Sequence, residues 1–171
     1  MDSLLRPSEW VEQFIPFLKN RSEILDLACG SGRHTRLLAN NGHKVTAVDV
    51  NPQSLKKLSE VPGVEIICAD LEKDRWPFAS SRKFDGVVVT NYLHRPIMAN
   101  ILKSLKNRGI LIYETFMVGN ERYGKPSNPE FLLKPNELIE YFGRDLKVIK
   151  YEAGVISRQR EAVIQRICAV R

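Results

Sequence analysis

The chain has 171 residues, of which 43% are hydrophobic and 27% are charged, with a formal net charge of +6. This is the composition of one ordinary globular domain with a buried core, and we expect a single domain over residues 1–171. The mild positive charge permits an acidic partner such as RNA, but it is not the dense basic block of a nucleic-acid-binding arm. Three scattered cysteines and no His/Cys cluster argue against a disulfide framework and a metal site.

The first predicted element is a helix within residues 1–20. Ser8 is a suitable N-cap, Glu9 lies in the first turn, and Pro16 should end the helix. One apolar stripe is formed by Trp10, Phe14, Phe17 and Leu18. We expect this helix to pack over an edge of the sheet, with a lid over a bound cofactor as the alternative. The start of the chain lacks a signal-peptide pattern, and no apolar run reaches ~20 residues, so we expect a cytoplasmic protein.

Strands and helices then alternate along the chain. Strands are predicted at residues 24–28, 44–48, 64–68, 84–89 and 109–115. Helices are predicted at residues 33–40, 52–60 and 96–106, whereas the charged segment 72–82 is predicted to be a loop. The alternation indicates an α/β fold with a doubly wound, Rossmann-like parallel sheet and helices on both faces.

The last third of the chain departs from this alternation. Residues 116–134 show no clear period and contain two glycines and two prolines, so we expect a long functional loop. A helix at 135–141 is followed by strands at 146–156 and 162–170, joined by a charged turn at 157–161. Because no helix separates these two strands, they should pair as an antiparallel hairpin.

The turn after the first strand is the most informative stretch of the sequence. It reads Asp26-Leu-Ala-Cys-Gly-Ser-Gly32, and it connects a strand to the N-terminus of a helix. Such a turn brings backbone N–H groups and a positive helix end close to a ligand. Thr35 stands where a dinucleotide-binding motif needs a third small residue, which disfavours a nicotinamide dehydrogenase. The carboxylate of Asp26 suits a ligand with an amino or hydroxyl group.

The turn resembles the first motif of the class I S-adenosylmethionine-dependent methyltransferases, D/E-x-G-x-G-x-G, with Ala28 at the first glycine. The likeness continues through Asp49, Asp70 and Asn91, which follow three further strands at intervals of about 20 residues. The overall spacing is similar to that of the small tellurite-resistance and thiopurine-type branch. The resemblance implies a seven-stranded sheet and S-adenosylmethionine as the cofactor, bound where the strands end.

The ligand's polar groups suggest a role for each residue of the motif set. Asp49 suits the ribose hydroxyls, Val50 the adenine face, and Asp70 with Leu71 the adenine amine. The methionine end is expected near Asp26 and the backbone of the turn, with Arg33 reaching the carboxylate or facing solvent. The expected cofactor-binding residues are Asp26, Ala28, Gly30, Gly32, Arg33, Asp49, Val50, Asp70, Leu71, Asn91, Tyr92 and Leu93.

Methyl transfer from a sulfonium requires alignment more than acid–base chemistry, because the leaving group is neutral. A base is needed only where the acceptor must lose a proton early, and the candidates are His94, Tyr92 and Glu114. Packing beside Pro96 is the competing interpretation of His94. The segment Thr90-Asn91-Tyr92-Leu93 lacks the two prolines typical of adenine-N6 and glutamine methylases. No cysteine follows the fourth or fifth strand, which disfavours the covalent 5-methylcytosine mechanism.

The favoured hypothesis is a methyltransferase that acts on a small acceptor covered by the loop 116–134. One alternative is an RNA or protein methyltransferase that uses the basic surface. Another is a non-catalytic S-adenosylmethionine-binding partner of a second protein. The sequence does not indicate the methyl acceptor or the oligomeric state.

Overall fold

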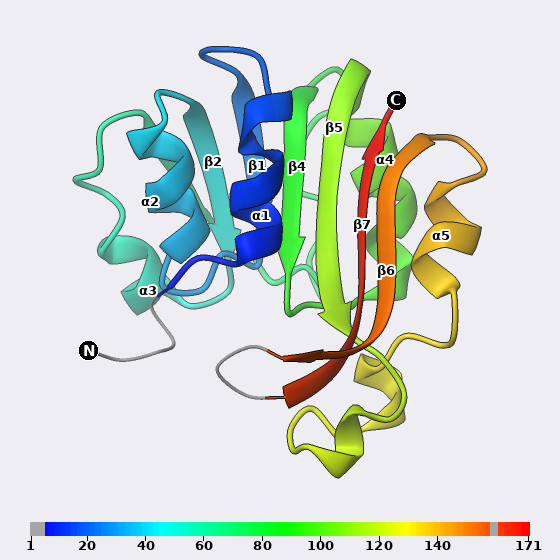
Figure 1. The fold of residues 1–171 in the computed structure, drawn as a ribbon. Helices are drawn as coiled ribbons and strands as arrows, with labels where there is room; N and C mark the ends of the chain where they lie inside the picture. Colours follow the sequence, from blue (N-terminus) through cyan, green and yellow to red (C-terminus); the bar gives the residue numbers. More distant parts are fainter. Residues whose placement is uncertain (1–5, 158–160) are drawn as a thin grey trace.

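A computed structural model describes residues 6–157 and 161–171 of the chain. Its seven strands form one sheet in the order β3-β2-β1-β4-β5-β7-β6, with helices on both faces (Figure 1). The first five strands are parallel, and β7 runs antiparallel to both of its neighbours, β5 and β6. The predicted doubly wound sheet with a C-terminal antiparallel hairpin is therefore confirmed. Most of the predicted turn at 157–161 lies outside the described residues.

The strands follow the apolar runs of the sequence closely. They are β1 (Glu23–Leu27), β2 (Lys44–Asp49), β3 (Val64–Cys68), β4 (Phe84–Thr90), β5 (Leu105–Phe116), β6 (Lys147–Ser157) and β7 (Glu161–Val170). The main difference is that β5 begins at Leu105, four residues before the predicted start. Leu105 pairs with Phe84 ahead of an irregularity in the β4–β5 register, and this pairing could not be read from local periodicity.

The helices are short, and several differ from the predicted ranges. They are α1 (Glu9–Phe14), α2 (Arg33–Asn40), α3 (Pro52–Lys56), α4 (Met98–Ser104) and α5 (Glu137–Phe142). The predicted helix 52–60 ends at Lys56, and 96–106 becomes a 3₁₀ turn, η3 (Arg95–Ile97), followed by α4. The helix predicted from residue 135 begins only at Glu137, because Asn136 has a left-handed backbone with φ of 62°.

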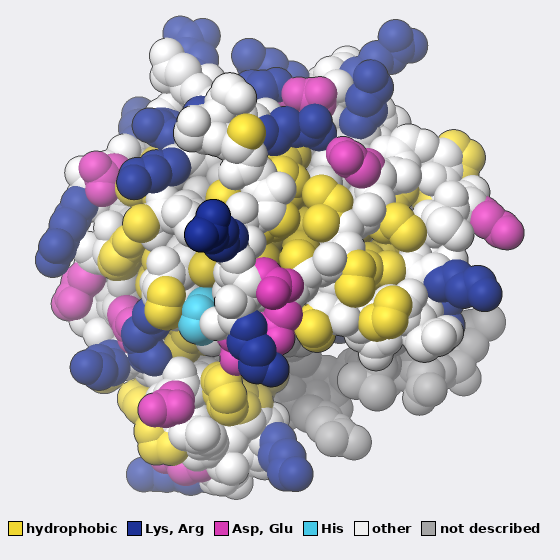
Figure 2. All heavy atoms as spheres, turned by 180° about the vertical axis from the view of Figure 1, so that it is seen from behind, with side chains coloured by type: hydrophobic (Ala, Val, Ile, Leu, Met, Phe, Trp, Pro, Cys, Tyr) yellow, Lys and Arg dark blue, Asp and Glu magenta, His cyan; other side chains and the backbone are white. Residues whose placement is uncertain are grey.

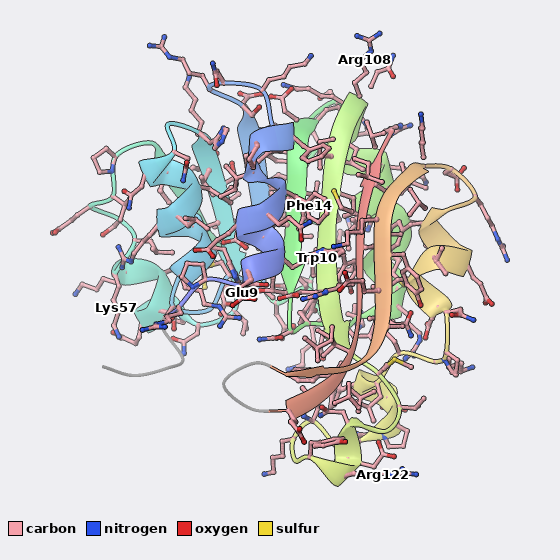
Figure 3. All side chains as sticks on the ribbon, viewed as in Figure 1. Glu9, Trp10, Phe14, Lys57, Arg108 and Arg122 are labelled. Atoms are coloured by element: carbon pink, nitrogen blue, oxygen red, sulfur yellow. The ribbon has the colours of Figure 1, made fainter. Side chains whose placement is uncertain are left out.

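Helix α1 packs on a face of the sheet, not over an edge as predicted. Its Trp10 and Phe14 point from the helix toward the strands (Figure 3) and join a core cluster with residues of β1, β4 and β5. Ser8 is the N-cap, since its hydroxyl oxygen accepts a hydrogen bond from the Trp10 N–H at 3.1 Å. Pro16 lies in the 3₁₀ turn η2 (Ile15–Phe17), which turns Phe17 away from the predicted stripe and leaves it 51% exposed.

The two faces of the sheet are covered by different helices. Helices α1 and α2 lie on one face, and α4 and α5 lie on the other (Figure 1). Alternate residues of β1 point to opposite faces of the sheet. Ile24 packs in the core cluster that contains α1, and Leu25 and Leu27 pack in the cluster on the other face. No helix among the described residues is long and apolar enough to cross a membrane.

Candidate functional site

The carboxyl ends of β1 to β4 meet at one edge of the sheet, where the sequence predicted the site. In-register pairing places Leu27 beside Val48 and Val89, and Asp49 beside Cys68. The residues that follow these positions surround a cavity of about 170 Å³, which we call the cofactor cavity. It is lined by Ala28, Asp49, Val50, Ala69, Asp70, Leu71, Glu72 and Tyr92. Six of these eight were predicted, and Ala69 and Glu72 were not.

The turn after β1 depends on backbone conformations that favour glycine. Gly30 and Gly32 have φ of 55° and 79°. A Cβ on Gly32 would collide with the Leu58 side chain, whereas no atom lies within 4 Å of a Cβ built on Gly30. The space beside Gly30 therefore lets a ligand approach the backbone closely. Ala28 adopts φ of 51°, so alanine at the first glycine position keeps the left-handed turn.

Asp49 holds this turn in place from the end of β2. Its Oδ2 accepts a hydrogen bond from the Gly30 N–H at 2.8 Å, and its Oδ1 accepts one from the Asn51 N–H at 2.9 Å. An ionised carboxylate has about four acceptor positions. Asp49 therefore retains acceptor capacity for ligand hydroxyls while it fixes the turn.

Asp26 lies beneath the turn and is 1% exposed. Its Oδ2 accepts a hydrogen bond from the Thr35 hydroxyl at 2.6 Å, whereas its buried Oδ1 has no hydrogen-bond partner among the described residues. Burial raises the pKa of this carboxyl to about 7, and the Thr35 hydrogen bond offsets only part of that effect. The sequence identified Asp26 but interpreted Thr35 only as a departure from a dinucleotide motif.

His34 is a buried polar residue that sequence reasoning missed. Its Nε2 accepts a hydrogen bond from the Ser8 N–H at 2.9 Å, and its Nδ1 lies 3.1 Å from the Thr90 hydroxyl. Since Nε2 is the acceptor, a neutral ring carries its proton on Nδ1 and donates it to Thr90. Beside it, Arg33 Nη1 donates to the Arg6 carbonyl at 3.3 Å. The segment before α1 thus crosses the start of α2.

A second cavity of about 210 Å³ adjoins the first, and we call it the acceptor cavity. It is lined by Glu72, Asn91, Tyr92, Leu93, Thr115, Phe116, Pro126 and Phe131. Tyr92 and Glu72 belong to both linings, so the two cavities share a wall. Three of the lining residues, Phe116, Pro126 and Phe131, come from the 116–134 segment.

The 116–134 segment is anchored at both ends. It contains the 3₁₀ turns η4 (Asn120–Arg122) and η5 (Pro129–Phe131), and Met117 bridges to Leu133. Asn120, which is 2% exposed, accepts from the Val163 N–H at 3.2 Å and donates to the Pro126 carbonyl at 3.1 Å. Arg122 projects from the outer end of the segment, away from the sheet (Figure 3).

Arg95 is the second residue that sequence reasoning missed. Its guanidinium donates to both carboxylate oxygens of Glu137 at 2.6 and 2.9 Å. It also donates to the carbonyls of Glu130 and Leu132, each at 2.9 Å. One side chain that follows β4 therefore holds η5 and the start of α5, and with them the Phe131 wall of the acceptor cavity.

The three candidate bases occupy different places. Tyr92 lines both cavities, and burial together with the carboxylates of Glu72, Asp70 and Asp49 raises its pKa, so the phenol keeps its proton at neutral pH. Among the described residues, neither His94 nor Glu114 lines either cavity. Glu114 is 1% exposed and alternates along β5 with Thr115, so it faces the opposite side of the sheet from the acceptor cavity.

Comparison with known proteins identifies the family to which the chain belongs. A family model described as a methyltransferase domain matches residues 24–109, half of the chain. The chain belongs to this methyltransferase family. Its fold and motif set are those of a class I S-adenosylmethionine-dependent methyltransferase, as the resemblance implied, and S-adenosylmethionine is the cofactor.

Two relatives and one solved structure illustrate the likeness. The methyltransferase chain is 33% identical over 89 residues to an uncharacterized RNA methyltransferase, pc0248, of Protochlamydia amoebophila, covering 48% of this chain and 20% of that protein. It is 28% identical over 109 residues to the malonyl-[acyl-carrier protein] O-methyltransferase of Acetivibrio thermocellus, covering 57% and 37%. TehB from Haemophilus influenzae superposes with a TM-score of 0.78 at 21% identity, covering 96% of this chain and 62% of TehB.

The chain thus spans well under half the length of these two relatives. Their names give two different acceptors at similar identity, so the acceptor does not follow from relatedness. The residues of this methyltransferase do fit the cofactor, on two observations of its own structure. The buried Asp26 Oδ1 lacks a hydrogen-bond partner among the described residues, and the space beside Gly30 admits a ligand to the turn.

Proposed function

We propose that this chain transfers a methyl group from S-adenosylmethionine to a small acceptor bound in the acceptor cavity. The observation that carries this proposal is the wall shared by the two cavities, formed by Tyr92 and Glu72. Two ligands, one in each cavity, would both contact Tyr92 and would lie next to each other. Direct transfer of a group between two bound molecules requires this proximity.

Each group of residues has a part in holding the cofactor. Asp49 would accept from the ribose hydroxyls, with Val50 against the adenine and Asp70 with Leu71 at its amine. Hydrogen bonding from the Glu72 N–H at 3.0 Å lowers the pKa of Asp70, which keeps that carboxylate ionised as an acceptor. Asp26 would face the methionine ammonium and Arg33 its carboxylate, beside the backbone of Ala28, Gly30 and Gly32.

The protein's contribution to the reaction is alignment and exclusion of water. When bound, the cofactor supplies an electrophilic methyl carbon with a neutral leaving group. Asn91, Tyr92 and Leu93 would position the acceptor on one side, and Phe116 and Phe131 on the other. Such alignment corresponds to effective molarities on the order of 10⁵ M or more. His94 and Glu114 line neither cavity, so each remains a candidate base only if its side chain moves into the acceptor cavity when ligands bind.

The alternative, RNA methylation, is supported by the net charge of +6 and by the relative pc0248. The position of one part of the basic surface argues against it. On the face drawn in Figure 2, some Lys and Arg side chains lie at the lower left and the bottom, while many lie along the upper rim, the end at which the parallel strands begin in Figure 1. Arg108, which precedes Gly109 within β5, projects from this end (Figure 3), opposite the carboxyl ends where both cavities lie. An RNA held there would lie far from the transferred methyl group.

The proposal is tested in two steps, first by calorimetry and then by a turnover assay. S-adenosylmethionine and S-adenosylhomocysteine should each bind folded protein saturably, with one ligand per chain. Turnover is then measured as S-adenosylhomocysteine release with a panel of small acceptors and with total RNA. If neither ligand binds, the cofactor assignment is wrong. If both bind but no acceptor supports turnover, the non-catalytic partner protein is the better interpretation.

A further inference from the structure

The acceptor cavity has an unusual balance of side chains. Of its eight lining residues, three are aromatic and two more, Leu93 and Pro126, are apolar. Glu72 is the only charged residue in this lining, and no Lys, Arg or His among the described residues contributes to it. The cavity is therefore mostly apolar, with the uncharged polar side chains of Asn91 and Thr115 and with one negative charge, Glu72, at the wall nearest the cofactor cavity.

The charge of Glu72 is not neutralised by its neighbours. Its backbone N–H donates to Asp70 Oδ1, which fixes the position of the residue, but its carboxylate makes no hydrogen bond or ion pair with any described residue. By contrast, Asp70 has Lys73 Nζ at 3.4 Å. The carboxylates of Glu72, Asp70 and Asp49 all lie in the lining of the cofactor cavity; burial is the main cause of the raised pKa of the Tyr92 phenol, and these carboxylates raise it further. The shared wall thus carries a net negative potential.

A negative charge beside aromatic rings is the chemistry that binds an ammonium group. A carboxylate forms charge-assisted hydrogen bonds with N–H donors, and the faces of Tyr and Phe attract cations. The same charge repels a carboxylate or phosphate, which would have to be desolvated without a cationic partner. We propose that the acceptor is a compact amine, with its apolar body among Tyr92, Phe116 and Phe131 and its nitrogen facing Glu72. This inference rests on the proposed function and deepens it.

The transfer step balances with these groups. The bound ammonium first loses one proton to the Glu72 carboxylate, which is solvent-exposed and passes it to water. The free amine nitrogen then forms a bond to the methyl carbon of the sulfonium donor. As the S–C bond breaks, its electron pair stays on sulfur, and the donor leaves as a neutral thioether. The product is the N-methylated ammonium.

The test uses the full chain saturated with S-adenosylhomocysteine, and binding is measured by calorimetry. The probes are matched sets with the same carbon skeleton: benzyl, 2-phenylethyl and 3-phenylpropyl compounds, each as amine, alcohol and carboxylate. At least one amine should bind at least ~5-fold tighter than its alcohol, and its carboxylate should bind weakest. Glu72→Gln should reduce the amine-to-alcohol preference by about 5- to 20-fold, because a charge-assisted hydrogen bond is lost at a partly exposed site.

Glu140→Gln is the matched control, since Glu140 is exposed on α5 and lines neither cavity. It removes the same charge and should leave the preference unchanged. Equal binding of amine and alcohol, or a preference that survives Glu72→Gln, overturns the inference. Absence of amine binding to protein that has bound S-adenosylhomocysteine overturns it as well, while leaving the proposed function intact. If S-adenosylhomocysteine itself does not bind, the proposed function fails and the inference fails with it.

Discussion

Replacing Asp26 by Asn should stabilise the cofactor-free protein at alkaline pH while weakening cofactor binding. Burial raises the pKa of the folded-state carboxyl from its ordinary value of 3.8 to about 7. Between these pH values the folded protein holds a proton that the unfolded chain releases. The free energy of unfolding therefore falls as pH rises through this window, and the loss is complete above about pH 7.

The size of this change in the free energy of unfolding follows from the shift in the pKa of Asp26. A tenfold change in an ionisation equilibrium is worth ~1.4 kcal/mol, so moving the pKa from 3.8 to about 7 corresponds to ~4 kcal/mol at most. Relaxation and water entry should reduce the measured value to ~1–3 kcal/mol. The amide oxygen of Asn can still accept from Thr35, so the variant should match wild type near pH 4 and exceed it at pH 8.

The assay is urea unfolding, monitored by circular dichroism, of cofactor-free wild type and Asp26→Asn at several pH values between 4 and 8. Asp85→Asn is a control of opposite sign. Burial alone would raise the pKa of Asp85, but hydrogen bonds from the Glu23 N–H and from Lys106 lower it, so its contribution is present at neutral pH and lost on acidification. A stability difference between wild type and Asp26→Asn that does not change with pH would refute the reasoning.

Three further predictions concern the site. Asp49→Ala should weaken S-adenosylhomocysteine binding by ~1.5–3 kcal/mol in calorimetry, because it removes the expected ribose acceptor and releases Gly30; unchanged affinity would contradict the assignment. Arg95→Ala should lower the free energy of unfolding by ~1–2 kcal/mol and raise KM for the acceptor more than it lowers kcat, with Arg95→Lys intermediate. His94→Ala should change the turnover rate less than tenfold at every pH; a loss of ~10²-fold or more that disappears at acidic pH would instead identify a base.

Local sequence was enough to predict most of the sheet. The apolar run before Asp49 and the run in residues 84–89 have no competing interpretation, because parallel strands are buried on both sides. The edge strand Val64–Cys68 was also predicted with its observed bounds, since Gly63 precedes it and a polar segment follows. The glycine turn could be predicted because its strand, its small residues and its helix are contiguous.

The parts that escaped prediction depend on partners distant in sequence. His34 contacts Thr90, 56 residues away, and Arg95 contacts Glu137, 42 residues away. Glu72 begins a charged loop, and nothing in its local sequence distinguishes it from the solvated charges that follow. The short helices were misjudged for a related reason, because helices of five to seven residues are stabilised by tertiary packing more than by their own propensity.

The position of β7 has a consequence for the order of folding during synthesis. This strand is inserted between β5 and β6, although its residues are made after both. Until residues 161–170 have left the ribosome, the twelve-residue strand β5 has one edge without a partner, and its backbone groups can pair with another nascent chain. The sheet should therefore be completed late in synthesis, when β7 pairs with both β5 and β6. Translation arrested before Glu161 should yield an aggregation-prone intermediate.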